Sequence, residues 1–269
     1  MGRIISLVNQ KGGVGKTTTS INLAASLGIL GKKVLLVDLD PQGNATTGVG
    51  VEKGALKYTI YNALRDECSS EEAIKRTKFK NLDLMPANIN LAGLDIEFIN
   101  KENEDSKFVK GAQLKRILNA VREEYDYILI DCPPSLGILT TNALTASDSV
   151  IIPVQCEFFA LEGIMLLLNS IRFARKKLNP NLEIEGVVLT MLDSRTILGL
   201  DVVENIRSFF KEKVYDTIIP RMIMLAEAPS HGKPISSYNS KSKATVAYIN
   251  LAKEVIERNA GEEQKTSTR

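Results

Sequence analysis

The chain has 269 residues, of which 44% are hydrophobic and 25% are charged, so a disordered or collagen-like chain is excluded. Its 34 basic and 32 acidic residues give a net charge of +2, and bulk charge therefore offers no argument for nucleic-acid binding. No apolar run reaches the roughly 18 residues of a membrane-spanning helix, and a strand pattern begins at once, so we expect a cytoplasmic protein without a signal peptide. Three cysteines without a C-x-x-C pair, and a single histidine, argue against a disulfide framework or a zinc site.

Short apolar runs alternate with helical stretches along the chain. Residues 3–8 predict a strand, and residues 17–30 carry apolar side chains at helical spacing up to Gly31, a residue type that favours helix ends. Residues 34–37 predict a second strand that is apolar throughout, which indicates burial on both faces. Further strands are predicted at residues 82–85, 127–130, 150–154, 187–192 and 217–219, and further helices at about 161–178 and 244–258.

The alternation of strands and helices through the whole chain predicts the fold class. It is typical of α/β proteins with a doubly wound, mostly parallel sheet and helices on both faces. No linker or internal repeat interrupts the pattern, so we expect a single domain over residues 1–258. Residues 259–269 are polar, and we expect them to form a disordered tail.

A glycine-rich loop with two lysines, residues 11–17 (KGGVGKT), stands between the first strand and the first helix. A phosphate-binding loop requires this context, because backbone N–H groups and a helix N-terminus then converge on one anion. We expect Lys16 to reach the β- and γ-phosphates of a nucleotide and Thr17 to bind Mg²⁺. The standard motif has a glycine where this chain has Gln10, and Lys11 stands at the front of the loop instead. The residues assigned to the nucleotide are Lys11, Gly12, Gly13, Val14, Gly15, Lys16, Thr17 and Thr18.

Two further predicted strands end in acidic residues, at the edge where open parallel sheets bind their ligands. Asp38 and Asp40 follow the second strand and lie on the same side of an extended chain. Asp38 is suited to hold Mg²⁺ through water, and Asp40 is suited to orient or deprotonate an attacking water; an ordinary turn aspartate is the alternative. Residues 127–131 are an apolar strand that ends at Asp131, which we expect on Mg²⁺ as in a Walker B motif.

Residues 11–17 resemble the deviant Walker A motif of the ParA/MinD class of P-loop ATPases. In that class the front lysine crosses a nucleotide-sandwich dimer and touches the phosphates of the partner's ATP, and the resemblance assigns this role to Lys11. The stretch around Asp38 and Asp40 resembles switch I of these ATPases, in which the second aspartate is needed for hydrolysis. The DCPPS run that begins at Asp131 resembles switch II of the chromosomal partition branch.

The branches of this class differ in features that a sequence can display. A nitrogenase iron protein or a metallochaperone would need paired cysteines, which this sequence does not offer. A septum-site protein would need an amphipathic basic helix at its C-terminus, whereas residues 259–269 are polar. Larger plasmid partition ATPases carry an extra N-terminal DNA-binding domain, which we do not expect here. The chain is therefore identified as a member of the short chromosomal ParA/Soj branch, a resemblance that covers about residues 2–258.

The resemblance implies an ATPase, slow without a stimulating partner, that binds ATP and Mg²⁺ and forms a homodimer with ATP. The dimer would bind double-stranded DNA without sequence preference, be released by a ParB-type centromere-binding protein during chromosome segregation, and need no membrane. Arg195 and Arg221 match DNA-contact positions, although Met224 stands where a further arginine is usual. Pro220 and Met222 lie where the family borders the adenine. The alternatives are a MinD-like membrane-recruited positioning ATPase and an ATP switch that regulates replication initiation.

Overall fold

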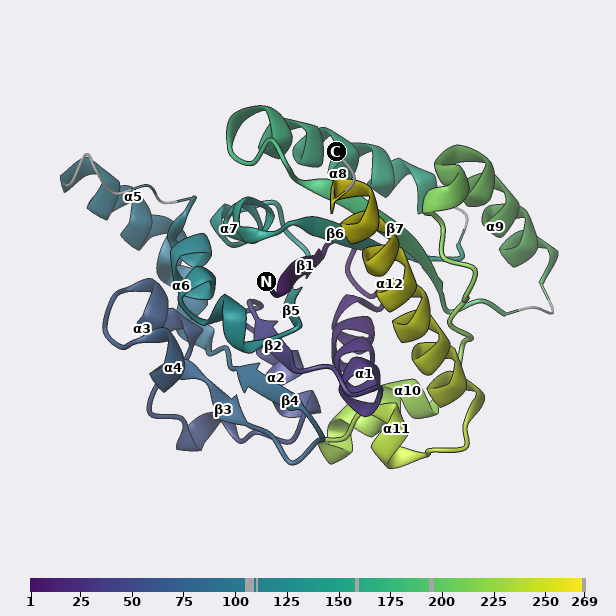
Figure 1. Cartoon of the computed structure of the whole chain (residues 1–269), viewed down its shortest axis with the longest axis horizontal. Coiled ribbons are helices and arrows are strands. Elements are labelled where there is room, and N and C mark those ends of the chain that lie inside the picture. The colour runs from purple at the N-terminus through teal and green to yellow at the C-terminus, as the bar shows by residue number, and fades with distance from the viewer. Residues whose placement is uncertain (105–108, 110, 158–159, 194–195, 268–269) are drawn as a thin grey trace.

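The computed structural model describes residues 1–104, 109, 111–157, 160–193 and 196–267. At its centre is a sheet with the spatial order β3-β4-β2-β5-β1-β6-β7 (Figure 1). All neighbouring strands in it are parallel except β3 and β4, which are antiparallel. The strands are β1 (Arg3–Leu7), β2 (Val34–Asp38), β3 (Lys75–Arg76), β4 (Leu82–Met85), β5 (Tyr127–Asp131), β6 (Ser149–Gln155) and β7 (Glu183–Thr190).

Helices cover both faces of this sheet. Figure 1 shows α1 and α12 on one side and α6, α7 and α8 on the other. The fold class predicted from the alternating pattern is thereby confirmed. The α-helices are α1 (Lys16–Ile29), α2 (Asn44–Gly48), α3 (Ile60–Leu64), α4 (Ser70–Ala73), α5 (Leu94–Glu104), α6 (Gln113–Val121), α7 (Ile138–Ala146), α8 (Ala160–Lys177), α9 (Ile197–Phe210), α10 (Met224–Glu227), α11 (Ile235–Tyr238) and α12 (Lys243–Ser267).

The central strands are buried on both faces, as their continuous apolar sequences predict. Successive residues of β1 enter different cores, since side chains alternate along a strand. Ile4 belongs to the core formed with α6, α7 and α8, whereas Ile5 belongs to the core formed with α1 and α12. The sheet is thus fixed between two apolar layers, and its carboxyl edge is left to carry polar groups.

Two predicted elements were wrong in type or extent. Residues 217–219 do not form a strand: the chain runs beside β7 but pairs with it only at separated points, such as Ile219 N–H to the Leu189 carbonyl at 2.9 Å. Pro220 follows, and it lacks the N–H that a continued ladder would need. Helix α12 continues to Ser267 rather than ending near residue 258, because glutamate, glutamine and lysine in this segment favour helix.

The fold brings three strand ends together at one edge of the sheet. Strand β5 lies between β1 and β2, and Asp131 is in register with both Leu7 and Asp38. The loop after β1, the loop after β2 and the loop after β5 therefore emerge side by side. This edge is where the predicted phosphate loop and the predicted acidic residues meet.

Candidate functional site

The loop between β1 and α1 has the backbone of an anion cradle. Gly13 and Gly15 have φ angles of +76° and +87°, a region that residues with a side chain rarely adopt. Gly15 is the N-cap of α1, and no side chain caps the first turn. The first N–H groups of α1 are thus directed towards an acceptor from outside the helix, and the helix dipole adds positive potential there.

The two lysines of the loop have different surroundings. Lys16 is only 6% exposed, and its Nζ donates to the Lys11 carbonyl at 3.1 Å. Burial lowers the pKa of Lys16, while the neighbouring Asp131 carboxylate opposes this shift. The Lys11 side chain is partly exposed, and its Nζ lies 3.4 Å from Glu157 Oε2. Lys16 is therefore enclosed in the site, whereas Lys11 lies at its rim.

Asp38 and Asp131 form a fully buried pair of acids at the ends of β2 and β5. Burial raises the pKa of Asp38 to about 6 and that of Asp131 to about 7, and the Asp38 charge adds to the shift of Asp131. Thr46 holds Asp38 Oδ2 with two hydrogen bonds of 2.7 Å, one from its N–H and one from its hydroxyl. Asp38 therefore also anchors the start of α2 to the sheet.

The two carboxylate oxygens of Asp131 differ in their hydrogen bonding. Ser20 donates its hydroxyl to Asp131 Oδ1 at 2.9 Å, while Oδ2 is buried without a hydrogen-bond partner among the described residues. A buried carboxylate oxygen left unpaired is costly, so this atom fits a ligand that carries positive charge. Thr17, in the first turn of α1, also lies within hydrogen-bonding reach of the Asp131 carboxylate, and this contact opposes the rise in the pKa of Asp131. These hard oxygen donors suit Mg²⁺.

Within the described ranges, no group of three or more Asp, Glu, His or Cys side chains is arranged to hold a metal. Any Mg²⁺ here would thus rest on one or two carboxylates together with oxygens of a bound substrate, which is how this ion is usually held.

Asp40 stands beside the buried pair and nearer the surface, with 9% exposure. Its N–H donates to Asp38 Oδ1 at 3.3 Å, and its Oδ1 accepts the N–H of Gln42 at 2.9 Å. Lys53 donates to the Gln42 carbonyl and thus ties the same loop from outside. The structure therefore brings Asp38, Asp40 and Asp131 to one place.

A mainly apolar hollow of about 240 Å³ adjoins the loop at Gly15 and Thr18. Pro220 and Met222, the predicted base contacts, line it together with Met191 and Tyr248. Thr190 fastens this wall to the loop by donating its hydroxyl to the Val14 carbonyl at 2.8 Å. The hollow is large enough for a flat aromatic base beside the phosphate loop.

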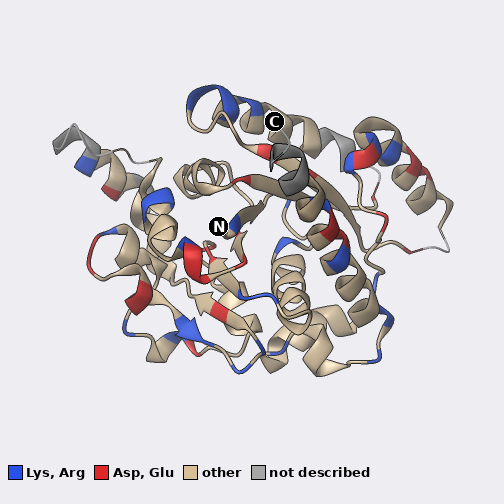
Figure 2. Ribbon diagram, viewed as in Figure 1, with Lys and Arg blue, Asp and Glu red and all other residues tan. Residues whose placement is uncertain are grey.

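The structure describes only one of the two arginines that were predicted to contact DNA. Arg221 is exposed and lies at the rim of the same hollow, whereas Arg195 lies outside the described residues. Figure 2 shows lysines and arginines spread over many elements with acidic residues between them, and a basic end on α8. The distribution of charge over the molecule therefore does not indicate which face would bind DNA.

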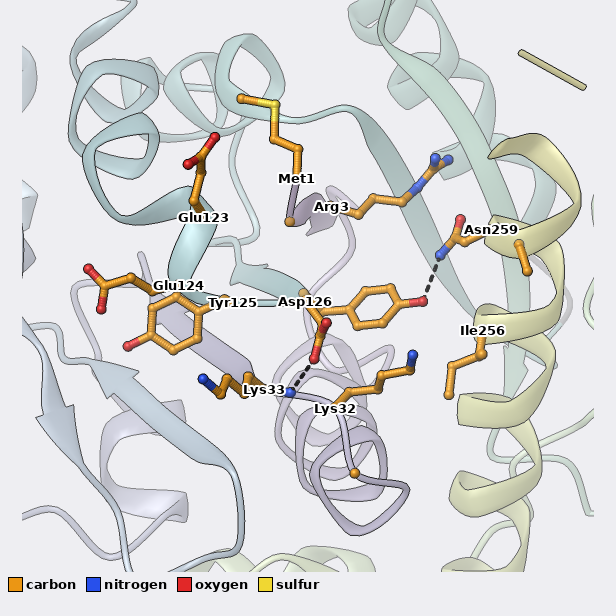
Figure 3. A pocket seen from close by; sticks show the side chains of 14 residues that line it. Met1, Arg3, Lys32, Lys33, Glu123, Glu124, Tyr125, Asp126, Ile256 and Asn259 are labelled. Atoms are coloured by element: carbon orange, nitrogen blue, oxygen red, sulfur yellow. Dashed lines mark hydrogen bonds between the residues drawn. The ribbon is translucent and has the colours of Figure 1, made fainter. Parts of the chain in front are cut away.

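A second hollow, of about 560 Å³, lies at the opposite edge of the sheet (Figure 3). There Asp126 accepts the N–H of Lys33 at 2.7 Å, and Asn259 donates to the Tyr127 hydroxyl at 3.4 Å. Side chains of both charge signs line it, and none of the predicted site residues is among them. The candidate site is therefore the carboxyl edge.

Sequence reasoning missed several residues of this edge. Ser20 and Thr46 orient the buried acids, Glu157 pairs with Lys11, and Met191 adopts a φ angle of +55° in the wall of the hollow. The spacing of Ser20 one helical turn after Lys16 was a signal that could have been used. Glu157 offered no such signal, because its contact with Lys11 joins segments that are 146 residues apart in the sequence.

Comparison with known proteins gives the family. A family model described as an AAA domain matches residues 2–184. The sporulation initiation inhibitor protein Soj of Bacillus subtilis is 56% identical over 255 residues, which cover 95% of this chain and 98% of that protein. The chain belongs to the ParA/Soj family of chromosome-partitioning ATPases. The chromosome partitioning protein ParA of Myxococcus xanthus is 47% identical to this ParA/Soj chain, over 96% of this chain and 89% of ParA.

Solved structures agree with the ParA/Soj assignment in fold. Cobyrinic acid a,c-diamide synthase from Mycobacterium smegmatis, with a bound ATP analogue and magnesium, has a TM-score of 0.84 and 35% identity, covering 95% of this chain and 94% of that one. The cell division ATPase MinD of Pyrococcus furiosus has a TM-score of 0.77 and 28% identity, covering 96% and 99%. Over the described part of this ParA/Soj chain, no helix is both long and apolar enough to cross a membrane.

Proposed function

We propose that this chain binds and hydrolyses ATP with Mg²⁺, and that two ATP-bound copies form a dimer that binds DNA without sequence preference. The observation that carries the proposal is the buried Lys16, enclosed between the uncapped start of α1 and the acid pair Asp38 and Asp131. A buried cation beside a backbone anion cradle suits a phosphate chain, and the apolar hollow next to it suits a base. The relatives act in partitioning, which supports a role in chromosome segregation in the cytoplasm, on the nucleoid.

Phosphate binding would be divided among backbone and side chains. The N–H groups of residues 12–18 donate hydrogen bonds to the phosphate oxygens. The Lys16 ammonium group gives up its hydrogen bond to the Lys11 carbonyl and binds the β- and γ-phosphates instead. Asp131 and Thr17 would hold Mg²⁺, and Asp38 would reach it through water. The ion, when bound, would neutralise charge on the phosphates. Pro220 and Met222 pack against the adenine, and main-chain groups select the base because methionine offers no strong hydrogen bond.

Hydrolysis would depend on Asp40. Its carboxylate lies beside the metal-facing pair without being part of it, and the bond from Gln42 N–H leaves its second oxygen for an attacking water. Asp40 orients this water and accepts its proton as the water oxygen bonds to the γ-phosphorus; the bond from this phosphorus to the β,γ-bridging oxygen breaks, and ADP leaves with the electron pair. A positioning or general-base group of this kind contributes about 10²–10⁴-fold to a rate.

Dimerisation and DNA binding would follow from the position of Lys11 at the rim. Lys11 of the partner subunit completes the charge around the triphosphate, so each copy needs the other. Turnover by this dimer is slow without a stimulating partner protein. Arg195 and Arg221 contact DNA phosphates, which explains binding without sequence preference. A ParB-type partner stimulates hydrolysis and releases the dimer from DNA.

The test measures molar mass by light scattering, and retention on a DNA column, without nucleotide, with ADP and with ATP. We expect a dimer that binds two unrelated duplexes equally, with ATP only. Lys11→Ala should still bind nucleotide and remain a monomer. Equal mass in all three nucleotide conditions, or a Lys11→Ala variant that dimerises normally, would refute the sandwich arrangement. Liposomes added with ATP distinguish membrane recruitment from DNA binding.

A further inference from the structure

The front lysine of the loop is held by its own subunit. Lys11 Nζ lies 3.4 Å from Glu157 Oε2, and the two side chains are 39% and 52% exposed. The other oxygen of this carboxylate accepts the amide of Gln155 at 2.5 Å, so the carboxylate is held from two sides. Glu157 follows β6, the neighbour of β1, which brings it to the edge of the sheet where Lys11 lies.

Both loop lysines therefore have partners within the chain. Lys16 donates to the Lys11 carbonyl, while the Lys11 side chain pairs with Glu157. A nucleotide bound to the same copy supplies acceptors for Lys16 directly. Lys11 differs, because its proposed target belongs to the second copy, and it must give up Glu157 before it can serve there.

Glu157 and a phosphate tail compete for the same ammonium group. A carboxylate offers one negative charge, a diphosphate offers more, and a triphosphate offers the most, so the exchange becomes more favourable with each phosphate. The need to release Lys11 from Glu157 therefore opposes dimerisation, and it opposes it least when the nucleotide carries a γ-phosphate.

We propose that Glu157 is a specificity-determining residue that restricts dimerisation to the triphosphate state by retaining Lys11 in its own subunit. The inference rests on the proposed ATP dimer. Glu157 acts through Lys11 and does not touch the reacting atoms, so it is a positioning residue.

The size of the effect follows from the exposure of the pair. Exposed ion pairs contribute little individually, but a symmetric dimer must break two of them. Neutralising Glu157 should therefore lower the ATP concentration at half-maximal dimerisation about three- to tenfold. It should also produce a measurable dimer fraction with ADP, where the wild-type protein gives none.

The experiment measures the dimer fraction by analytical ultracentrifugation across ATP and ADP titrations. It compares the wild-type protein with Glu157→Gln, Glu157→Asp, Lys11→Ala and the double variant Lys11→Ala/Glu157→Gln. Glu183→Gln is the matched control, since it makes the same charge change at the exposed start of β7, on the opposite edge of the sheet. Thermal melting checks that each variant is folded.

We expect Glu157→Gln to dimerise at lower ATP and partly with ADP, while Glu157→Asp and Glu183→Gln behave like the wild-type protein. Neutralising Glu157 should have no effect when Lys11 is already alanine. If the wild-type protein dimerises with ATP and Glu157→Gln does so equally or less readily, this inference is overturned and the proposed function stands. If the wild-type protein does not dimerise with ATP, both are overturned.

Discussion

At the scale of single residues, the site depends on charges that are kept out of water. Lys16, Asp38 and Asp131 are each nearly or fully buried, and any one of them alone would cost several kcal/mol. Asp131 is the strongest of the charges that offset the burial of Lys16. The three groups are thus balanced against one another, and substituting one changes the ionisation of the others.

The first prediction concerns this buried cation. Lys16→Ala should weaken ATP binding about 10- to 150-fold, because hydrogen bonds from a charged donor to the phosphates are removed. Titration with a fluorescent ATP analogue measures the affinity, and Lys33→Ala, at the opposite edge of the sheet, is the control. An unchanged dissociation constant for Lys16→Ala would show that the phosphates bind elsewhere.

A pH dependence follows from the raised pKa of Asp131, about 7 against an ordinary value of 3.8. Between these values the folded protein keeps a proton that the unfolded chain has released. The stabilisation is complete below about pH 4 and is lost as pH rises through 7, at up to about 1.4 kcal/mol per pH unit. Without nucleotide and Mg²⁺, the free energy of unfolding should therefore fall from pH 5 to pH 8 relative to Asp131→Asn.

Urea unfolding at pH 5, 6.5 and 8 measures this difference. Mg²⁺ and ATP should restore stability to the wild-type protein at pH 8, since bound cation replaces the missing proton. A constant difference between wild type and variant across this range would mean that Asp131 ionises normally in the fold.

At the scale of elements, the position of α1 is set by close backbone contact. A Cβ on Gly28, near the end of α1, would lie 2.3 Å from the Lys80 carbonyl oxygen, which is backbone and cannot rotate away. A helical glycine elsewhere lacks this constraint: around Gly163 in α8, no atom of the described residues outside the adjoining helix backbone lies within 4 Å of the added Cβ. Alanine substitutions at Gly28 and at Gly163 can therefore be compared as a test and its control.

Gly28→Ala should lower the free energy of unfolding by about 1–3 kcal/mol, because the helix must shift to relieve the contact. Gly163→Ala should raise it by about 0.5–1 kcal/mol, the ordinary gain of alanine over glycine in a helix. Chemical denaturation measures both. Equal effects of the same sign would show that α1 is not held against the loop before β4.

The elements of the site could be predicted where the pattern is local. The run from β1 through residues 11–17 into α1 carries its own turn, charge and helix signals, and the apolar strands ending at Asp38 and Asp131 are equally self-contained. Contacts between distant segments could not be predicted: Glu157 on Lys11 and Thr190 on Val14 arise only when the sheet assembles. The strand predicted at residues 217–219 was wrong for the same reason, since neighbouring chain geometry decides whether an extended segment pairs.

At the scale of the whole molecule, charge is nearly balanced, with a net value of +2. One copy therefore has little long-range attraction for DNA, and affinity must come from particular cations that a dimer presents twice. Each cation that neutralises a DNA phosphate contributes a fixed amount to the salt dependence of binding.

Arg195→Ala and Arg221→Ala should each weaken binding equally on unrelated duplexes. Each should also lower the slope of log affinity against log salt by about one unit, if the arginine neutralises one phosphate. Fluorescence anisotropy between about 50 and 200 mM salt gives the slope, with ATP-dependent dimerisation as the control. Weaker binding on one sequence only, or failure to dimerise, would contradict a phosphate-binding role.

The central claim is that ATP itself joins two copies and that Asp40 ends this state by hydrolysis. The most direct measurement is the molar mass of Asp40→Ala with ATP, taken together with nucleotide content and phosphate release. The account predicts a stable dimer with ATP bound, phosphate release reduced about 10²–10⁴-fold, and retention on DNA even when a ParB-type partner is added. A variant that stays monomeric with ATP bound, or one that releases phosphate at the normal rate, would contradict it.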